Sequence, residues 1–209
     1  MSNYQDCNWI GPRATNGASG EGLADFLIAK IKQLGSIKTI CDLGCGNGHL
    51  AGQLAANGYE VTGIDASETG HEIACRNYPD VDFVQSLIDP GLFTNGVGPF
   101  DLIVSSDVIE HMYRPADLLE TAALLLKPKG HLLVGTPYHG YIKNLVLSAT
   151  GKMDSHFTVL NDGGHIKFFS VKTLSTLTEN CGFTGLKFSF YGRAPWLWKN
   201  MLCHARKVG

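Results

Sequence analysis

The chain has 209 residues, of which 44% are hydrophobic and 17% charged, and its formal net charge is −2. This length suits one α/β domain with a full core, and the charge excludes an extended basic footprint for a nucleic-acid backbone. The six cysteines include no CxxC pair, and no apolar run approaches the roughly 20 residues that span a bilayer.

These features predict a cytoplasmic protein with reduced thiols, without a disulfide framework or a zinc site. Residues 1–11 show no basic cluster followed by an apolar run, so we expect no signal peptide there. We expect a single domain over residues 1–209, no nucleic-acid partner and no stable membrane insertion.

Apolar, β-rich runs alternate with helical patterns through the first two thirds of the chain. The expected strands are Ile37–Cys41, Glu60–Ile64, Val81–Gln85, Phe100–Ser105, Leu132–Thr136, Leu186–Tyr191 and Lys199–Arg206. The expected helices are Gly48–Asn57, a helix from Ser67 to about Tyr78, one from Pro115 that ends before Pro128, and Ser170–Cys181, with a loop or short helix over Asp89–Gly96. The alternation predicts a parallel sheet with helices on both faces, and ligands of such sheets bind beyond the carboxyl ends of the strands.

Two segments do not follow this alternation. Residues 1–20, rich in Gly, Asn and Ser, are expected to form an N-terminal lid or arm. Residues 138–165 form a long insertion after the fifth strand, with a short amphipathic helix expected over residues 141–147. We interpret this insertion as a substrate lid. A homodimer contact and a shallow contact with a membrane surface are its alternative roles.

The most informative run is CDLGCGNG at residues 41–48, which joins the first strand to the first helix. Gly44, Gly46 and Gly48 allow the backbone to turn sharply and to approach a ligand closely. Asp42 precedes the first glycine by two residues. A carboxylate there would repel a pyrophosphate and suits a ligand that carries an ammonium group.

A second carboxylate, Asp65, ends the second expected strand. An acid at this place can accept hydrogen bonds from both ribose hydroxyls of a bound nucleoside. Enzymes that bind NAD use the same arrangement, so Asp65 alone indicates only a nucleoside. The GxGxG spacing and the two acids together favour S-adenosylmethionine, which carries an ammonium and a sulfonium, over NAD.

The run from Cys41 to Leu50 closely resembles motif I of class I methyltransferases, and Asp65 matches the acid that follows this motif. Residues 84–87 (VQSL) stand where that family contacts adenine, and residues 100–111 (FDLIVSSDVIEH) resemble its motif IV. The resemblance covers roughly residues 37–136, which include the turn LKPKG at residues 126–130, and a second stretch over residues 164–183. Within that family, the sequence is most similar to the branch of the ubiquinone-biosynthesis O-methyltransferases.

The resemblance implies an α/β fold with a doubly wound, seven-stranded, mostly parallel sheet of Rossmann-like type, in which the last strand is antiparallel and an insertion follows strand 5. It also implies S-adenosylmethionine as the methyl donor. The residues expected to bind this donor are Asp42, Gly44, Cys45, Gly46, Gly48, Asp65, Ala66, Ser86, Leu87 and Ser106.

Methyl transfer is an in-line displacement in which the enzyme mainly aligns the acceptor, and a general base assists when the acceptor is a hydroxyl. Imidazole titrates near neutral pH and is the natural candidate. His111 ends the motif IV segment, His139 follows the fifth strand, and His165 lies where the insertion rejoins the fold. Each of the three could instead order a loop by a hydrogen bond to the backbone.

Asp107, Glu110 and His111 allow a second interpretation. If a helix begins here, spacings of three and four place all three side chains on one face. Two carboxylates and an imidazole could then hold a divalent cation that orients a catechol-like acceptor, as the resemblance to the ubiquinone branch implies. Asp107 stands where that branch leads us to expect Glu. The alternative is that the two acids cap the helix.

We therefore expect an enzyme that moves a methyl group from S-adenosylmethionine to a small-molecule acceptor, most readily to the oxygen of a phenol, quinol or sugar. Two rivals stay open at this point. One is a nicotinamide-dependent oxidoreductase on the same framework. The other is a non-catalytic module that binds S-adenosylmethionine or serves as an inactive partner subunit.

Overall fold

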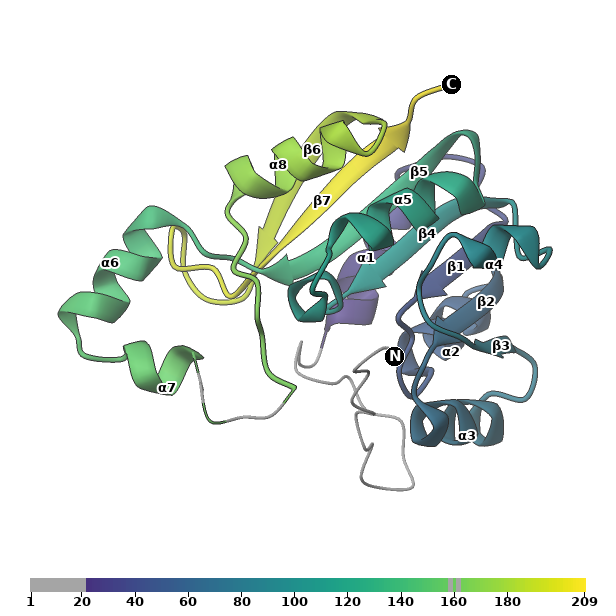
Figure 1. The fold of residues 1–209 in the computed structure, drawn as a ribbon, viewed down its shortest axis with the longest axis horizontal. Coiled ribbons are helices and arrows are strands. Elements are labelled where there is room, and N and C mark those ends of the chain that lie inside the picture. The colour runs from purple at the N-terminus through teal and green to yellow at the C-terminus, as the bar shows by residue number, and fades with distance from the viewer. Residues whose placement is uncertain (1–21, 158–159, 161–162) are drawn as a thin grey trace.

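The computed structural model describes residues 22–157, 160 and 163–209. Its centre is a seven-stranded sheet in the order β3-β2-β1-β4-β5-β7-β6 (Figure 1). The strands are β1 (Thr39–Leu43), β2 (Glu60–Asp65), β3 (Asp82–Gln85), β4 (Phe100–Ser106), β5 (Leu126–Pro137), β6 (Phe183–Tyr191) and β7 (Asn200–Lys207). Strands β1 to β5 pair in parallel, and β7 runs antiparallel to both β5 and β6. The expected seven-stranded fold with an antiparallel last strand is confirmed.

Helices cover both faces of this sheet. They are α1 (Leu23–Ile31), α2 (His49–Ala56), α3 (Glu68–Asn77), α4 (Gly91–Thr94), α5 (Ala116–Leu125), α6 (Tyr141–Ala149), α7 (Met153–Phe157) and α8 (Val171–Asn180), with a 3-10 turn η2 (Ile109–His111). Neighbouring strand residues point to opposite faces: Ile40 packs with α1 and α2, whereas Cys41 packs with α5 and α8. The described residues therefore form two cores, one on each side of the sheet.

Helix caps confirm three of the local signals in the sequence. The Ser67 hydroxyl accepts a hydrogen bond from the Gly70 N–H at 3.0 Å and begins α3. Ser170 and Thr173 form a reciprocal capping box at the start of α8. Gly58, at φ 88°, follows the end of α2. The predicted positions of these helix ends are therefore right within a few residues.

Two elements differ from the expectation. Helix α1 was not predicted, although Leu27 and Ile31 in it are fully buried against the sheet. Strand β5 begins at Leu126, directly after α5, and includes the LKPKG run expected as a turn. The pairing of β4 and β5 shifts register between Phe100 and Leu102, and Lys129 takes φ 62°. The turn residues therefore form an irregular start of β5 and not a separate loop.

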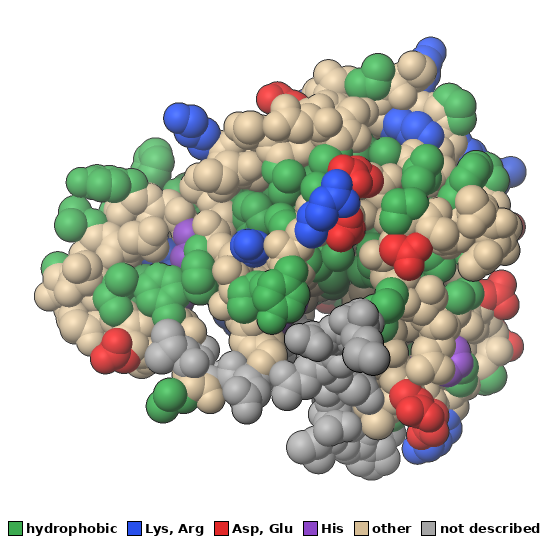
Figure 2. Space-filling view, in the orientation of Figure 1, with side chains coloured by type: hydrophobic (Ala, Val, Ile, Leu, Met, Phe, Trp, Pro, Cys, Tyr) green, Lys and Arg blue, Asp and Glu red, His purple; other side chains and the backbone are tan. Residues whose placement is uncertain are grey.

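The insertion forms two helices, α6 and α7, which lie beyond the carboxyl end of β5 in Figure 1. The expected helix over residues 141–147 is confirmed and runs on to Ala149. Its outer face is apolar, with Tyr141 81% exposed and Leu145 55% exposed, and Figure 2 shows hydrophobic side chains gathered over this region. Among the helices of the described residues, none is long and apolar enough to cross a bilayer. The expected arm over residues 1–20 lies outside the described residues.

Candidate active site

The glycine loop connects the carboxyl end of β1 to α2. Gly44, Gly46 and Gly48 all have positive φ, at 87°, 52° and 76°. A Cβ at Gly44 would overlap the Val108 side chain, and one at Gly48 would lie 2.7 Å from the Ala74 Cβ. The loop is therefore pressed against its neighbours in a backbone conformation that L side chains rarely adopt.

Asp65 fastens this loop to the end of β2. Its Oδ2 accepts a hydrogen bond of 2.8 Å from the Gly46 N–H, and its Oδ1 accepts one of 2.8 Å from the Ser67 N–H. A carboxylate oxygen can accept more than one hydrogen bond, so these two bonds are compatible with further bonds from ribose hydroxyls. Asp65 thus lies where the sequence places the ribose-binding acid.

Asp42 is a buried acid directly beneath the loop. Its side chain is 2% exposed, and its Oδ2 has no hydrogen-bond partner among the described residues. Burial, together with the negative charge of Asp65, raises the pKa of Asp42 to about 7. A cationic ligand group would offset both effects, so this pair of acids fits the ammonium of a bound S-adenosylmethionine.

Two further residues expected at the donor lie beside the loop. Cys45 is half-buried, with its Sγ 3.0 Å from the place that a Cβ on Gly63 would take, and burial raises the pKa of its thiol. Ala66 lies between Asp65 and Ser67 and is also half-buried. Their contact with the donor stays a prediction.

The residues expected near adenine and methionine lie at neighbouring strand ends. The Ser86 N–H donates to the Asp65 carbonyl at 2.9 Å, which brings the end of β3 beside β2. Leu87 follows and is 41% exposed. Ser106 ends β4, and its Oγ lies 2.9 Å from the place that a Cβ on Gly135 would take. Ser86 and Leu87 are therefore available to a ligand, whereas the Ser106 side chain faces β5.

Glu110 is a second buried acid and lies in the 3-10 turn η2 that follows β4. It is fully buried, its Oε2 accepts a 2.9 Å hydrogen bond from the Thr136 hydroxyl, and its backbone carbonyl accepts from the N–H groups of Ile166 and Lys167. Burial, and then the charge of Asp107, raises the pKa of Glu110 to about 8. The sequence predicts Glu110 only as a metal ligand or a helix cap, because its burial is a long-range property that the local sequence does not show.

Two of the three candidate histidines lie beside Glu110. His165 Nε2 is 3.9 Å from Glu110 Oε1, and the rings of His111 and His165 meet edge to face at 4.8 Å. Burial is the main cause that lowers the pKa of His165 to about 4. His111 Nδ1 lies 2.9 Å from the Gly163 carbonyl oxygen, a distance at which a protonated Nδ1 donates to it. The end of the insertion is thereby joined to η2.

The expected metal-ligand set is wrong in one member. Asp107 has φ 56° and its N–H donates to the Gly135 carbonyl, so it stays tied to the sheet and does not begin a helix. Only the 3-10 turn η2 follows, and the three side chains do not share a helix face. Among the described residues, the ligand atoms within 4.8 Å of one another belong to Glu110, His111 and His165. A carboxylate and two imidazoles could hold a divalent cation.

His139 packs in an aromatic cluster under the insertion and lines the same cavity as His165. It is 7% exposed, and its ring packs against the rings of His156, Phe157 and Phe168 at centroid distances of 5.1 to 5.9 Å. The backbone N–H of His139 donates to the Phe169 carbonyl, and burial is the main cause that lowers the pKa of the His139 imidazole to about 4. The structure therefore brings His111 and His165 to Glu110 and places His139 under the insertion.

A doubly wound sheet with a glycine loop after β1 and an acid at the end of β2 defines a nucleoside-binding domain of the class I methyltransferase type. A methyltransferase domain family matches residues 20–187, and the chain belongs to this family. The expected family is confirmed.

Curated relatives agree with this assignment. The chain is 37% identical over 117 residues to a ubiquinone biosynthesis O-methyltransferase of Caulobacter vibrioides, a match that covers 54% of the chain and 46% of the relative. It is 31% identical over 163 residues to the enzyme of the same name from Vibrio campbellii, a match that covers 73% of the chain and 68% of the relative. The chain thus spans about half the length of the Caulobacter relative.

Solved structures show the same fold. A SAM-dependent methyltransferase from Archaeoglobus fulgidus aligns with a TM-score of 0.70 at 17% identity, covering 90% of this chain and 94% of the other. The magnesium protoporphyrin IX methyltransferase of Synechocystis, solved with bound SAH, aligns with a TM-score of 0.64 at 19% identity. This alignment covers 88% of this chain and 81% of the other. At these identities the likeness establishes the fold.

Proposed function

We propose that this chain transfers a methyl group from S-adenosylmethionine to an oxygen atom of a small-molecule acceptor. The observation that carries the proposal is the glycine loop with the buried acid Asp42 beneath it and Asp65 bonded to it, in a chain of the methyltransferase family. Two neighbouring carboxylates suit a cationic donor and disfavour the pyrophosphate of a nicotinamide cofactor. The family match likewise favours a methyltransferase over an oxidoreductase.

The donor side is assigned to the carboxyl ends of β1, β2 and β3. Asp42 and the glycine loop bind the methionine part, Asp65 accepts hydrogen bonds from the ribose, and Ser86 and Leu87 line the adenine. When bound, S-adenosylmethionine supplies an electrophilic methyl group on a sulfonium. Asp42 then gains a cationic partner for its buried oxygen.

On the acceptor side, Glu110 and His165 form a proton-accepting pair. An acceptor hydroxyl that hydrogen-bonds to His165, the more exposed member of this pair, can release its proton to the pair as its O–CH₃ bond forms, while the S–CH₃ bond of the donor breaks and S-adenosylhomocysteine is the leaving group. His111 is a positioning residue, since its hydrogen bond to the Gly163 carbonyl joins η2 to the end of the insertion. A module that only bound the donor would have no need for a buried acid and an imidazole at this place.

The choice of oxygen rests on the relatives, because both are named O-methyltransferases and one of them matches over 73% of this chain. Five cysteines of the described part are free thiols, which supports a reducing compartment such as the cytoplasm. Phenols, quinols and sugars are the acceptors to test first.

The test is a turnover assay with S-adenosylmethionine and matched phenol, catechol, sugar and amine acceptors, read by mass spectrometry. We expect S-adenosylhomocysteine to form together with an O-methylated product. Methylation of only the amines, by protein that binds the donor, would contradict the oxygen assignment and leave the donor assignment intact.

A further inference from the structure

A cavity of about 190 Å³ lies next to the Glu110–His165 pair, between the insertion and the β6–β7 loop. His165 belongs to its wall, so the cavity adjoins the place where we expect the acceptor hydroxyl. Three cationic side chains also line it: Lys143 from α6, Arg193 from the β6–β7 loop, and Lys199 just before β7. We call this space the basic cavity.

Its most buried cation is Lys143. This side chain is 3% exposed although α6 points apolar residues to the outside, and its Nζ donates a 2.7 Å hydrogen bond to the Tyr138 carbonyl. Burial, and then the positive charges of Arg193 and Lys199, lower the pKa of Lys143 to about 8. Three like charges directed at one space repel one another, and an anion between them would offset this repulsion.

The loop that carries two of these cations is held in a constrained shape. Arg193 takes φ 64°, and a Cβ on the preceding Gly192 would lie 2.9 Å from the Lys199 Cβ. The Lys199 N–H donates to the carbonyls of Tyr191 and Gly192 at 3.2 Å and 3.0 Å. Non-glycine residues in this backbone region cost free energy and are concentrated at functional sites. The backbone that carries the two exposed cations is therefore held in one conformation by these contacts.

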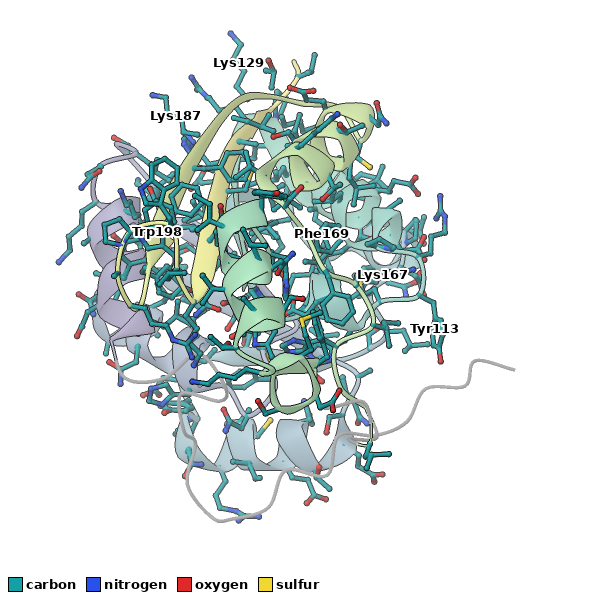
Figure 3. All side chains as sticks on the ribbon, turned by 90° about the vertical axis from the view of Figure 1, so that its left-hand side faces the viewer. Tyr113, Lys129, Lys167, Phe169, Lys187 and Trp198 are labelled. Carbon is teal, nitrogen blue, oxygen red and sulfur yellow. The ribbon has the colours of Figure 1, made fainter. Side chains whose placement is uncertain are left out.

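Aromatic side chains support the same region. Trp198 stacks on Phe190 at 4.5 Å and meets Tyr138 edge to face at 5.8 Å. Figure 3, in which α6 faces the viewer, shows Trp198 on one side of this helix and Phe169 on the other. The contact of Trp198 with Tyr138 supports the chain directly before α6, the helix that presents Lys143.

A neutral donor completes the set. Asn200 lines the basic cavity and is 3% exposed, and its Nδ2 has no hydrogen-bond partner among the described residues. A buried amide donor without a partner costs free energy that a ligand oxygen would recover. Lys199 also acts on a buried acid, Asp107, whose pKa is raised to about 6 by burial while the charge of Lys199 opposes that rise.

We propose that the basic cavity binds an anionic oxygen group, a carboxylate or a phosphate, carried by the methyl acceptor. This inference rests on the proposed function, because it treats the cavity as part of the acceptor site. Arg193 can form two parallel hydrogen bonds with such a group, Lys143 and Lys199 supply charge, and Asn200 donates to a remaining oxygen. A water molecule takes about 30 Å³ of the liquid, so the cavity has room for a polyatomic group.

The test is a ligand-observed NMR titration of the full chain, with and without S-adenosylhomocysteine, in a buffer free of phosphate. The probes are benzoate against its neutral isostere benzamide, and phenyl phosphate against inorganic phosphate. We expect benzoate or phenyl phosphate to bind at least about tenfold more tightly than benzamide, a ratio typical of hydrogen bonds to charged groups. Equal affinity of all aromatic probes would overturn the inference.

Variants tie the effect to the cavity. Arg193→Gln, at an exposed loop position, and Lys143→Met should each reduce the preference for the anion about tenfold, whereas Lys172→Met on the surface of α8 should leave it unchanged. Arg193→Gln keeps the test valid if Lys143→Met does not fold. Binding of inorganic phosphate alone, without either aromatic anion, would also overturn the inference. Loss of S-adenosylhomocysteine binding in the unmodified chain would instead count against the donor site.

Discussion

The Gly46 N–H donates a hydrogen bond of 2.8 Å to Asp65 Oδ2, so the acid at the end of β2 is bonded to the glycine loop that follows β1. One carboxylate thus shapes the loop and lies where the ribose of a nucleoside is expected. The donor site therefore depends on a contact between two strands as well as on the motif itself.

Asp65→Ala should weaken the binding of S-adenosylhomocysteine by about 1–3 kcal/mol, because charged hydrogen bonds to the ribose and to the loop are both lost. Calorimetry measures the affinity. Asp80→Ala, which removes an exposed carboxylate before β3, is the control and should bind as the unmodified chain does. An unchanged affinity in folded Asp65→Ala would remove this residue from the donor site.

Gly44→Ala should abolish donor binding and lower the melting temperature. Gly44 has φ 87°, and a Cβ there would overlap Val108. Gly58→Ala is a matched control, since Gly58 has φ 88° and nothing within 4 Å of its Cβ position. The control isolates the backbone strain, about 1–2 kcal/mol, and should keep its donor affinity. Equal losses in both variants would show that the packing of the loop is unimportant.

Glu110→Gln should reduce turnover by about 10²–10⁴-fold while the affinity for S-adenosylhomocysteine stays close to that of the unmodified chain. The exposed Glu72→Gln on α3 serves as the control. His165→Ala should fall in the same range, because the two groups act as a pair 3.9 Å apart. Full activity of Glu110→Gln is the result that would rule out its role.

We expect the activity to persist in a chelator, since the pair acts as a base. Activity that requires an added divalent cation would reassign Glu110, His111 and His165 as metal ligands. The assay is the same turnover measurement with and without EDTA, and the calorimetric titration with S-adenosylhomocysteine shows whether the donor site is affected.

Asp42 gives a pH dependence of stability with a definite sign. Its pKa is raised from 3.8 to about 7 in the folded chain, so the folded state holds this proton more firmly than the unfolded state does. The contribution of Asp42 to stability is complete below pH 3.8 and is lost as the pH rises through 7. The melting temperature of Asp42→Asn should therefore exceed that of the unmodified chain by more at pH 8 than at pH 5, with no ligand present. A difference that does not change with pH would contradict the raised pKa.

The elements that the sequence predicts well are those set by local pattern. Ser67 and Ser170 mark two helix starts, and the glycine loop and Asp65 lie at the carboxyl ends of β1 and β2 as expected. The four-residue spacing of Leu27 and Ile31 is typical of a helix and indicates α1, which the expected elements did not include. These features depend on residues that are close together in the chain.

The features that the sequence did not show depend on distant contacts. Asp107 does not begin a helix because its backbone N–H donates a hydrogen bond to the Gly135 carbonyl in β5. His165, at the end of the insertion, lies beside Glu110 in η2. Lys143 on α6 can be buried because its ammonium donates a hydrogen bond to the Tyr138 carbonyl. In each case a tertiary contact overrides the pattern of the local sequence.

The central claim is tested most directly by calorimetric titration of the purified chain with S-adenosylhomocysteine, with NADH titrated in parallel. The arrangement of Asp42, Asp65 and the glycine loop predicts micromolar binding of S-adenosylhomocysteine and no binding of NADH. Binding of NADH alone, or of neither ligand by folded protein free of copurified nucleoside, would contradict the assignment of this loop as a methyl-donor site.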